Sequence, residues 1–192
     1  MNKKELILSE AKRLFGNYGY LGFTLKQLAQ ACDMTAPALY YFYSCKADLF
    51  KDCLISELEL RGRGLLEMGR QHQHLTEFTA ELARMAFAQC AASHFKVGQA
   101  MQDVIHLQPH LQAELREAWD KLLISPVEEF LARAMPDRVS GISRKLLANF
   151  LINMATYAAT KEETFGREAL TRVMVAAAAG MEHELSQTAM SA

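Results

Sequence analysis

The chain has 192 residues, of which 51% are hydrophobic and 22% charged, and its formal net charge at pH 7 is −1. This balance is ordinary for a globular protein and excludes a histone-like, purely electrostatic DNA binder. No apolar run is long enough to span a bilayer, the N-terminus is unlike a signal peptide, and the four cysteines form no CxxC pair. We therefore expect a cytoplasmic protein with reduced thiols.

The first quarter of the chain predicts three helices in quick succession. Apolar residues recur at helical spacing over residues 3–18, and Gly19 follows as a helix-ending glycine. Thr24 has Gln27 three residues on, which is the capping-box spacing that begins a second helix. After a predicted turn, Thr35 can cap a third helix with a proline in its first turn.

The third of these helices has an outward face that packing alone does not explain. Leu39 and Tyr43 lie four residues apart and can both face the helix before it. This leaves small residues and then aromatic ones outside: Ala36, Pro37, Ala38, Tyr40 and Tyr41. An exposed helix start of this kind is typical of a recognition helix, whose first residues approach base edges in a DNA groove.

The rest of the chain predicts further helices without an internal repeat. The first of these helices is expected over residues 46–68, where Gly62 and Gly64 weaken it and indicate a bend or an early end. Residues 69–74 are predicted to form a loop. Pro126 makes the segment that ends at Met135 either one kinked helix or two helices. The expected ranges are 46–68, 76–93, 96–107, 109–135, 141–160 and 167–186.

Residues 7–50 resemble the N-terminal domain of TetR-family transcriptional regulators. The motifs stand in the family's order and spacing: Ala11, Leu14-Phe15, Gly19-Tyr20, Thr24, Leu28-Ala29, Leu39-Tyr40, Lys46 and Leu49-Phe50. Three positions depart from the pattern, because Asp33 replaces a turn glycine, Tyr43 a frequent phenylalanine and Cys45 a common serine. The resemblance implies an all-α fold of about nine helices, with a three-helix helix-turn-helix DNA-binding domain at residues 1–47. A larger helical domain for effector binding and dimerisation is expected at residues 48–192.

The resemblance also implies a function, that of a homodimeric repressor released from a pseudo-palindromic operator by a small apolar or amphipathic ligand. The implied DNA-facing residues are Thr24, Lys26, Thr35, Ala36, Pro37, Ala38, Tyr40, Tyr41 and Lys46. Because no Arg, Asn or Gln lies between Thr35 and Tyr43, we expect methyl contacts, Lys26 and DNA shape to provide much of the specificity. The net charge of the N-terminal region agrees with DNA binding, since residues 1–50 carry six basic and four acidic residues.

Two further sets of residues are assigned within the larger domain. The last two helices are apolar over more than one stripe, so a second copy of the chain is expected to cover them. The expected dimer interface comprises Leu147, Phe150, Leu151, Met154, Val173, Met174, Ala177 and Met181. The expected ligand pocket comprises Met85, Met101, Ile105, His106, Trp119, Phe130, Met154 and Tyr157.

Several alternatives stay open from the sequence. A metal-responsive regulator would use Asp103, His106 and His110, and a thiol-responsive one Cys32 or Cys45, which flank the recognition helix. A helical protein-interaction module without DNA binding is the alternative of another class. No nucleophile–base set, metal signature or phosphate loop is present, so we expect neither an enzyme nor a resident metal or cofactor.

Overall fold

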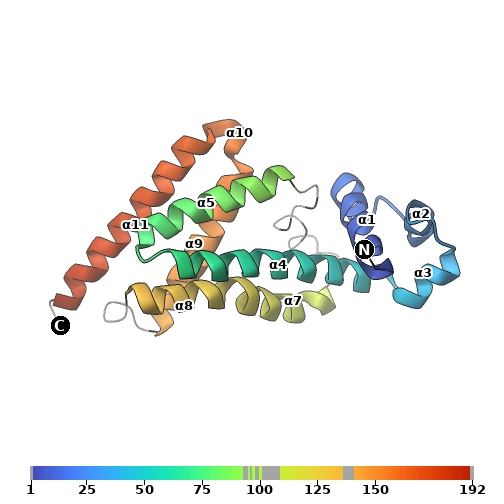
Figure 1. Ribbon diagram of the computed structural model, residues 1–192, viewed down its shortest axis with the longest axis horizontal. Coiled ribbons are helices and arrows are strands. Elements are labelled where there is room, and N and C mark those ends of the chain that lie inside the picture. The colour runs from blue at the N-terminus through green and yellow to red at the C-terminus, as the bar shows by residue number, and fades with distance from the viewer. Residues whose placement is uncertain are drawn as a thin grey trace. The chain divides into compact units, whose positions relative to one another are not determined.

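The computed structural model describes residues 2–92, 95, 97, 100, 109–135 and 141–190, and these are helical apart from turns and short connections. The predicted all-α fold, with a helix-turn-helix near the N-terminus, is confirmed. Figure 1 shows the elements. They are α1 (Lys3–Tyr18), α2 (Leu25–Ala31), α3 (Ala36–Phe42), α4 (Lys46–Gln71), α5 (Leu75–Ala92), η1 (Pro109–Leu111), α7 (Gln112–Trp119), η2 (Asp120–Ile124), α8 (Ser125–Ala134), α9 (Gly141–Thr160), α10 (Glu162–Phe165) and α11 (Arg167–Met190).

The chain divides into two compact units. Unit 1 comprises Met1–Leu58 and Ser93–Ala118, and unit 2 comprises Glu59–Ala92 and Trp119–Ala192. Helix α4 is continuous and contributes its first half to unit 1 and its second half to unit 2. One helix therefore belongs to both units.

Unit 1 is held together by an aromatic core. The ring of Phe15 on α1 lies 4.8 Å from that of Phe23 and 4.7 Å from that of Phe50 on α4, measured between centroids. Helix α1 ends at Gly19, which has a φ of 69°, as its sequence predicts, and it begins at a capping box between Asn2 and Glu5 that was not predicted. These contacts hold α1, the segment before α2 and the start of α4 together.

The second half of α4 differs from its predicted course. The helix passes through Gly62, Gly64 and Gly69 without ending and runs to Gln71, so the loop predicted at residues 69–74 is confined to its last three positions. A Cβ atom on Gly62 would lie 2.4 Å from the carbonyl oxygen of Leu122 in η2. The glycine at this position therefore permits a close helix–helix approach, which outweighs its low helix propensity.

The segment around Pro126 is neither simply kinked nor split. Helix α7 passes directly into the π-helical turn η2, and α8 follows with the proline in its first turn. The amide of Ser125 donates to the carbonyl of Asp120, five residues back, which is the hydrogen bond of a π-turn. One extra residue is thus accommodated without interrupting the helical path.

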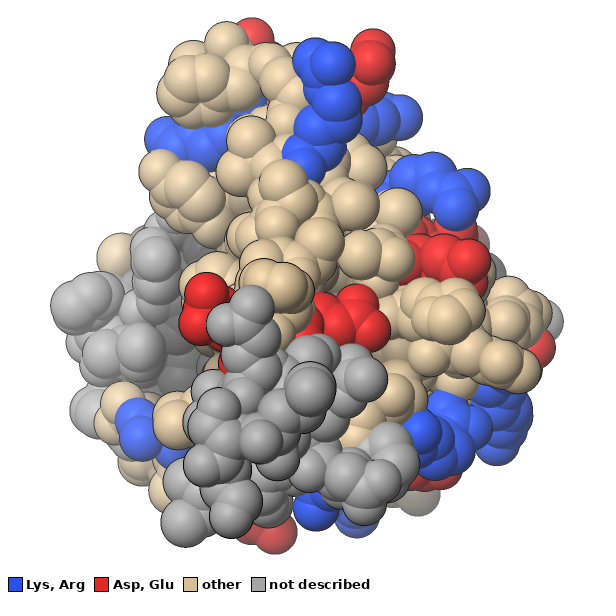
Figure 2. All heavy atoms as spheres, turned by 90° about the vertical axis from the view of Figure 1, so that its left-hand side faces the viewer, with Lys and Arg blue, Asp and Glu red and all other residues tan. Residues whose placement is uncertain are grey.

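Unit 2 is a layered helical bundle. Helix α5 packs against α9 and α11, and α8 packs against α9 and η2. The rings of Phe78 and Phe130 are stacked at 4.0 Å between α5 and α8. On the face shown in Figure 2, the described Lys and Arg side chains lie in separate groups among acidic and uncharged ones. No helix in the described ranges is both long and apolar enough to cross a membrane.

Candidate nucleic-acid interface

The second helix begins as its sequence predicts. The amide of Gln27 donates to Thr24 Oγ1 at 3.3 Å, and the amide of Thr24 donates to Gln27 Oε1 at 2.8 Å. Both halves of the capping box are therefore present, and two amides that the helix start leaves unpaired gain partners. This fixes where α2 begins.

The turn between α2 and α3 depends on a residue in an uncommon backbone conformation. Asp33 has a φ of 52°, in the left-handed region that glycine adopts most readily. The amide of Met34 donates to the carbonyl of Ala29 at 2.8 Å and closes the turn. Aspartate tolerates this region better than most residues, so the turn keeps a glycine-like geometry without the glycine.

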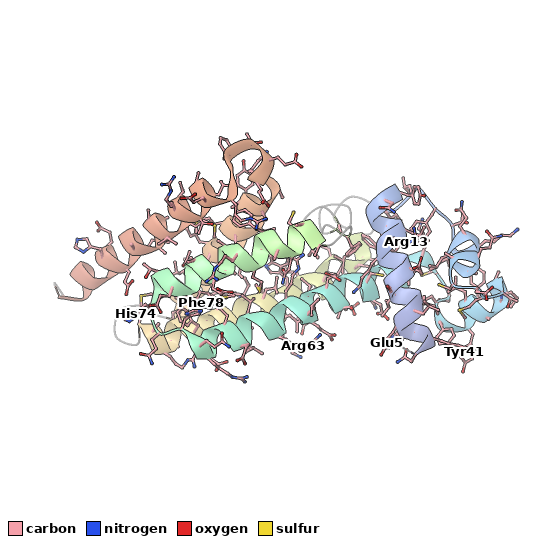
Figure 3. All side chains as sticks on the ribbon, turned by 45° about the horizontal axis from the view of Figure 1, so that its top comes forward. Glu5, Arg13, Tyr41, Arg63, His74 and Phe78 are labelled. Atoms are coloured by element: carbon pink, nitrogen blue, oxygen red, sulfur yellow. The ribbon has the colours of Figure 1, made fainter. Side chains whose placement is uncertain are left out.

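Helix α3 is anchored on one side and exposed on the other. The amide of Ala38 donates to the capping hydroxyl of Thr35 at 3.4 Å. Leu39 and Tyr43 are buried, as their spacing predicts. On the opposite side Tyr41 is 87% exposed, and Figure 3 labels it at the edge of the group formed by α1, α2 and α3.

The remaining assigned residues of this face are mostly accessible. Thr24, Lys26, Thr35, Pro37 and Tyr40 are exposed, whereas Ala36 and Ala38 are half-buried. Phe42 was not assigned from the sequence, yet it is also exposed, and its ring lies 5.6 Å from that of Tyr41 in an edge-to-face contact. The run of three consecutive aromatic residues at 40–42 is the signal that could have indicated it.

Lys46 occupies an environment that its sequence position does not reveal. Its ammonium group donates to the carbonyl oxygen of Phe23 and lies 4.1 Å from the centroid of the Phe23 ring and 5.2 Å from that of Tyr20. Burial lowers the pKa of this lysine. The side chain therefore joins the start of α4 to the segment before α2 through cation–π contacts.

Most of the basic side chains of α1 have acidic partners within unit 1. Lys12 Nζ lies 2.8 Å from Glu57 Oε1 and donates to Ser56 Oγ at 2.9 Å. Arg13 pairs with Glu10 at 2.7 Å. Lys26 on α2 is exposed. The lysine on α2 is thus a more accessible phosphate ligand than these two groups of α1.

The cysteines beside α3 have different environments. Cys32 is buried, and burial raises the pKa of its thiol. Cys45 is exposed, and its Sγ donates to Asp48 Oδ2 at 3.2 Å. His110 is exposed, and the other two residues of the candidate metal site, Asp103 and His106, lie outside the described residues.

The residues assigned to a ligand pocket differ in their burial. Phe130 is buried against Phe78, Tyr157 is exposed on α9, and three residues are half-buried: Met85, Trp119 and Met154. Met101, Ile105 and His106 lie outside the described residues.

The residues assigned to a dimer interface divide between the inside and outside of unit 2. Leu147, Leu151 and Met174 are buried within the chain itself. Phe150 and Val173 are exposed, and three others are half-buried: Met154, Ala177 and Met181. Leu146 was not assigned, although it is 67% exposed one turn before Phe150 on α9.

Two capped helices, α2 and α3, are joined by a tight turn, and α3 has an exposed aromatic face. This arrangement defines a helix-turn-helix DNA-binding protein. Residues 7–53 match the family model described as bacterial regulatory proteins of the TetR family. This segment is therefore similar to the DNA-binding domain of that family of transcriptional regulators. No curated protein is significantly similar to the chain in sequence.

Solved structures share the fold over most of the chain at low sequence identity. AibR, in complex with isovaleryl coenzyme A and operator DNA, is 18% identical, with a TM-score of 0.66 over 91% of this chain and 96% of its own. FadR from Bacillus subtilis, in complex with stearoyl-CoA, is 12% identical, with a TM-score of 0.64 over 91% and 96%. The reduced form of NemR from E. coli is 12% identical, with a TM-score of 0.75 over 93% and 95%.

Proposed function

We propose that the chain is a homodimeric repressor that binds a pseudo-palindromic operator through α3 and leaves it when a small amphipathic ligand binds in unit 2. The observation that carries this proposal is the two-sided character of α3. Its buried side fixes the helix through Leu39 and Tyr43, while Pro37, Tyr40 and Tyr41 remain exposed. An exposed aromatic face on an anchored helix of a helix-turn-helix suits insertion into the major groove.

Different side chains of the face have different roles in this proposal. Lys26, Tyr40 and Tyr41 bind phosphates, which positions the protein without reading the sequence. Ala36, Pro37 and Ala38 lie at the start of α3 and contact thymine methyl groups. Lys46 supports the face from behind, because its ammonium group already bonds to Phe23.

The proposed dimer forms through α9 and α11, both of which pack against α5. Their outer surfaces carry four large exposed side chains: Leu146, Phe150, Tyr157 and Val173. Tyr157 is 66% and Val173 65% exposed, which is unusual for large apolar groups on neighbouring helices and favours an interface that a second copy covers. A two-fold dimer would read half-sites about 34–36 Å apart, or a multiple of that.

An acyl thioester is the first ligand class to test. Two proteins of this fold are seen with isovaleryl coenzyme A and stearoyl-CoA, and both ligands are amphipathic. In this chain Met85, Trp119 and Met154 are half-buried in unit 2 and suit contact with an acyl chain. The length of the acyl group is left to experiment.

The DNA-binding part of the proposal is tested by selecting bound duplexes from random oligonucleotides and measuring affinity for the selected duplex. We expect Tyr41→Ala to weaken binding about tenfold, whereas Tyr18→Ala, a change of an exposed tyrosine on α1, should have little effect. Lys26→Ala should reduce the slope of log affinity against log salt by about 1, and Lys3→Ala should not. Failure to select any duplex would contradict the proposal.

The dimer is tested by sedimentation of the full chain. A charge introduced by Val173→Arg or Phe150→Arg should convert dimers to monomers and abolish binding to a two-half-site duplex. Leu60→Arg is the matched control, because Leu60 is an exposed leucine on α4 of the same unit. A wild-type chain that sediments as a monomer at micromolar concentration would rule out the proposed assembly.

Ligand release is tested on the selected duplex with isovaleryl-CoA and stearoyl-CoA, and with free coenzyme A as the control. We expect at least one acyl thioester to lower the affinity for DNA while coenzyme A does not. If neither thioester changes the affinity, this ligand class is incorrect, and the DNA-binding part of the proposal is unaffected.

A further inference from the structure

The end of α3 carries a buried tyrosine whose hydroxyl group bonds to a carboxylate on α4. Tyr43 caps α3, and its amide donates to the carbonyl of Leu39 at 3.0 Å. Its ring is buried, and its hydroxyl donates to Asp52 Oδ2 at 3.0 Å. A phenylalanine would fill the same space without the hydroxyl, so hydrophobic burial alone does not require a tyrosine here.

The same carboxylate oxygen also bonds to the first helix. Lys4 Nζ on α1 lies 3.1 Å from Asp52 Oδ2 and 5.9 Å from the centroid of the Tyr43 ring. One oxygen atom on the second turn of α4 therefore joins the beginning of α1 to the end of α3. These three residues, Lys4, Tyr43 and Asp52, all belong to unit 1 and are named here the Asp52 cluster.

The tyrosine hydroxyl stays protonated at neutral pH and can therefore donate to Asp52. Burial raises the pKa of Tyr43, and the hydrogen bond to Asp52 raises it further. A hydroxyl–carboxylate bond is effective only over donor–acceptor distances of about 2.5–3.0 Å. A displacement of α4 by about 1 Å relative to α3 would break it, whereas an apolar contact between the same helices would tolerate that movement.

We infer that the Asp52 cluster sets the orientation of α3 on α4, and that Tyr43 and Asp52 are positioning residues for sequence-specific DNA recognition. This inference rests on the DNA-contacting role proposed above for α3. Neither residue needs to touch DNA, because each acts through Pro37, Tyr40 and Tyr41 on the exposed side of α3. Base readout depends on the angle at which this helix enters the groove, whereas phosphate attraction depends on it much less.

The test compares affinity for the selected duplex with affinity for a scrambled duplex of the same length and composition. We expect Tyr43→Phe to weaken binding to the selected duplex about fivefold to tenfold. Affinity for the scrambled duplex, the salt slope and the melting temperature should change little. Tyr18→Phe is the matched control, because it removes an exposed tyrosine hydroxyl from α1 of the same unit and should change neither affinity.

A double-mutant cycle separates positioning from independent effects. Asp52→Ala also removes the ion pair with Lys4, so it should reduce specificity at least as much as Tyr43→Phe, and the double variant should be no worse than Asp52→Ala alone. Asp52→Asn keeps an oxygen that accepts from Tyr43, so it should restore most of the specificity.

Two results would overturn the inference. One is an unchanged ratio of the two affinities in Tyr43→Phe, and the other is a parallel loss of both affinities together with the melting temperature. A wild-type protein that selects no duplex would instead refute the proposed function, so the two failures are distinguishable.

Discussion

The helix-turn-helix and the α9–α11 pair are both helical, yet they are specified by different kinds of interaction. In the helix-turn-helix, short polar side chains close the helix starts, as Thr24 and Thr35 do, and Asp33 forms the turn between them. In α9 and α11, apolar side chains cover much of the helix surface, and several of them are exposed. Local hydrogen bonds therefore define the first region, and the filling of space defines the second.

This difference predicts where a substitution is costly. Removing a cap should cost little, because the loss is confined to one helix end. Removing core volume from unit 2 should cost much more, because the surrounding helices relax only partly around a cavity.

The largest effect is expected in the core of unit 2. Phe130→Ala removes one ring of the pair stacked at 4.0 Å and should lower the free energy of unfolding by about 3–5 kcal/mol, measured by denaturant titration. Phe165→Ala, at an exposed position on α10, should change it by less than about 0.5 kcal/mol. Equal effects of the two changes would show that the stacked pair does not stabilise this core.

The second effect contrasts two helix glycines of unit 2. Gly62→Ala should destabilise by about 1–3 kcal/mol, because the added methyl group would lie 2.4 Å from the carbonyl oxygen of Leu122. Gly180→Ala meets no atom within 4 Å in the protomer and should stabilise by up to about 1 kcal/mol in thermal unfolding. If both alanines stabilise, the close approach of α4 and η2 is not maintained in solution.

A smaller effect is expected in the helix-turn-helix. Thr24→Ala removes both hydrogen bonds made by the threonine hydroxyl in the cap of α2 and should cost about 1 kcal/mol in thermal unfolding. Ser9→Ala, an exposed change within α1, should cost nothing and gain a few tenths of a kcal/mol. A loss as large as that of Phe130→Ala would contradict the contrast between the two regions.

The smallest effect is expected from the buried thiols, which should leave stability unchanged at neutral pH and lower it in alkali. Burial raises the pKa of Cys53 in α4 and of Cys32 above the usual 9.0. The stability that these protonated thiols contribute is fully present below pH 9.0 and is lost as the pH rises above it, because only the unfolded chain ionises freely. Cys53→Ala should flatten this alkaline decline in unfolding experiments, whereas a change at the exposed Cys45 should not.

The extent to which the sequence could predict the structure follows the same division. The bounds of α1, both caps and the turn at Asp33 were predictable, because each depends on residues close together in the chain. The family match at residues 7–53 lies in the same region. Local chemistry and the family's motifs thus coincide there.

Features that depend on tertiary contacts could not be predicted. Helix α4 continues through Gly69, which lies close to Arg133 and Phe130 of α8. Helix propensity depends on residue type alone and does not include such contacts with another helix. The short helix α10 was not predicted. The engagement of Lys46 by the carbonyl of Phe23 and the bond from Tyr43 to Asp52 join residues whose proximity the fold alone creates.

The π-turn at Asp120–Ile124 has a practical consequence through the residue before it. Trp119, the single tryptophan of the chain, ends α7 at the position where the backbone passes from the α-helical to the π-helical path. It is half-buried, so its indole emission should respond to changes in local polarity. The protein thus carries its own fluorophore at this junction, and candidate effectors can be titrated against it without an attached dye.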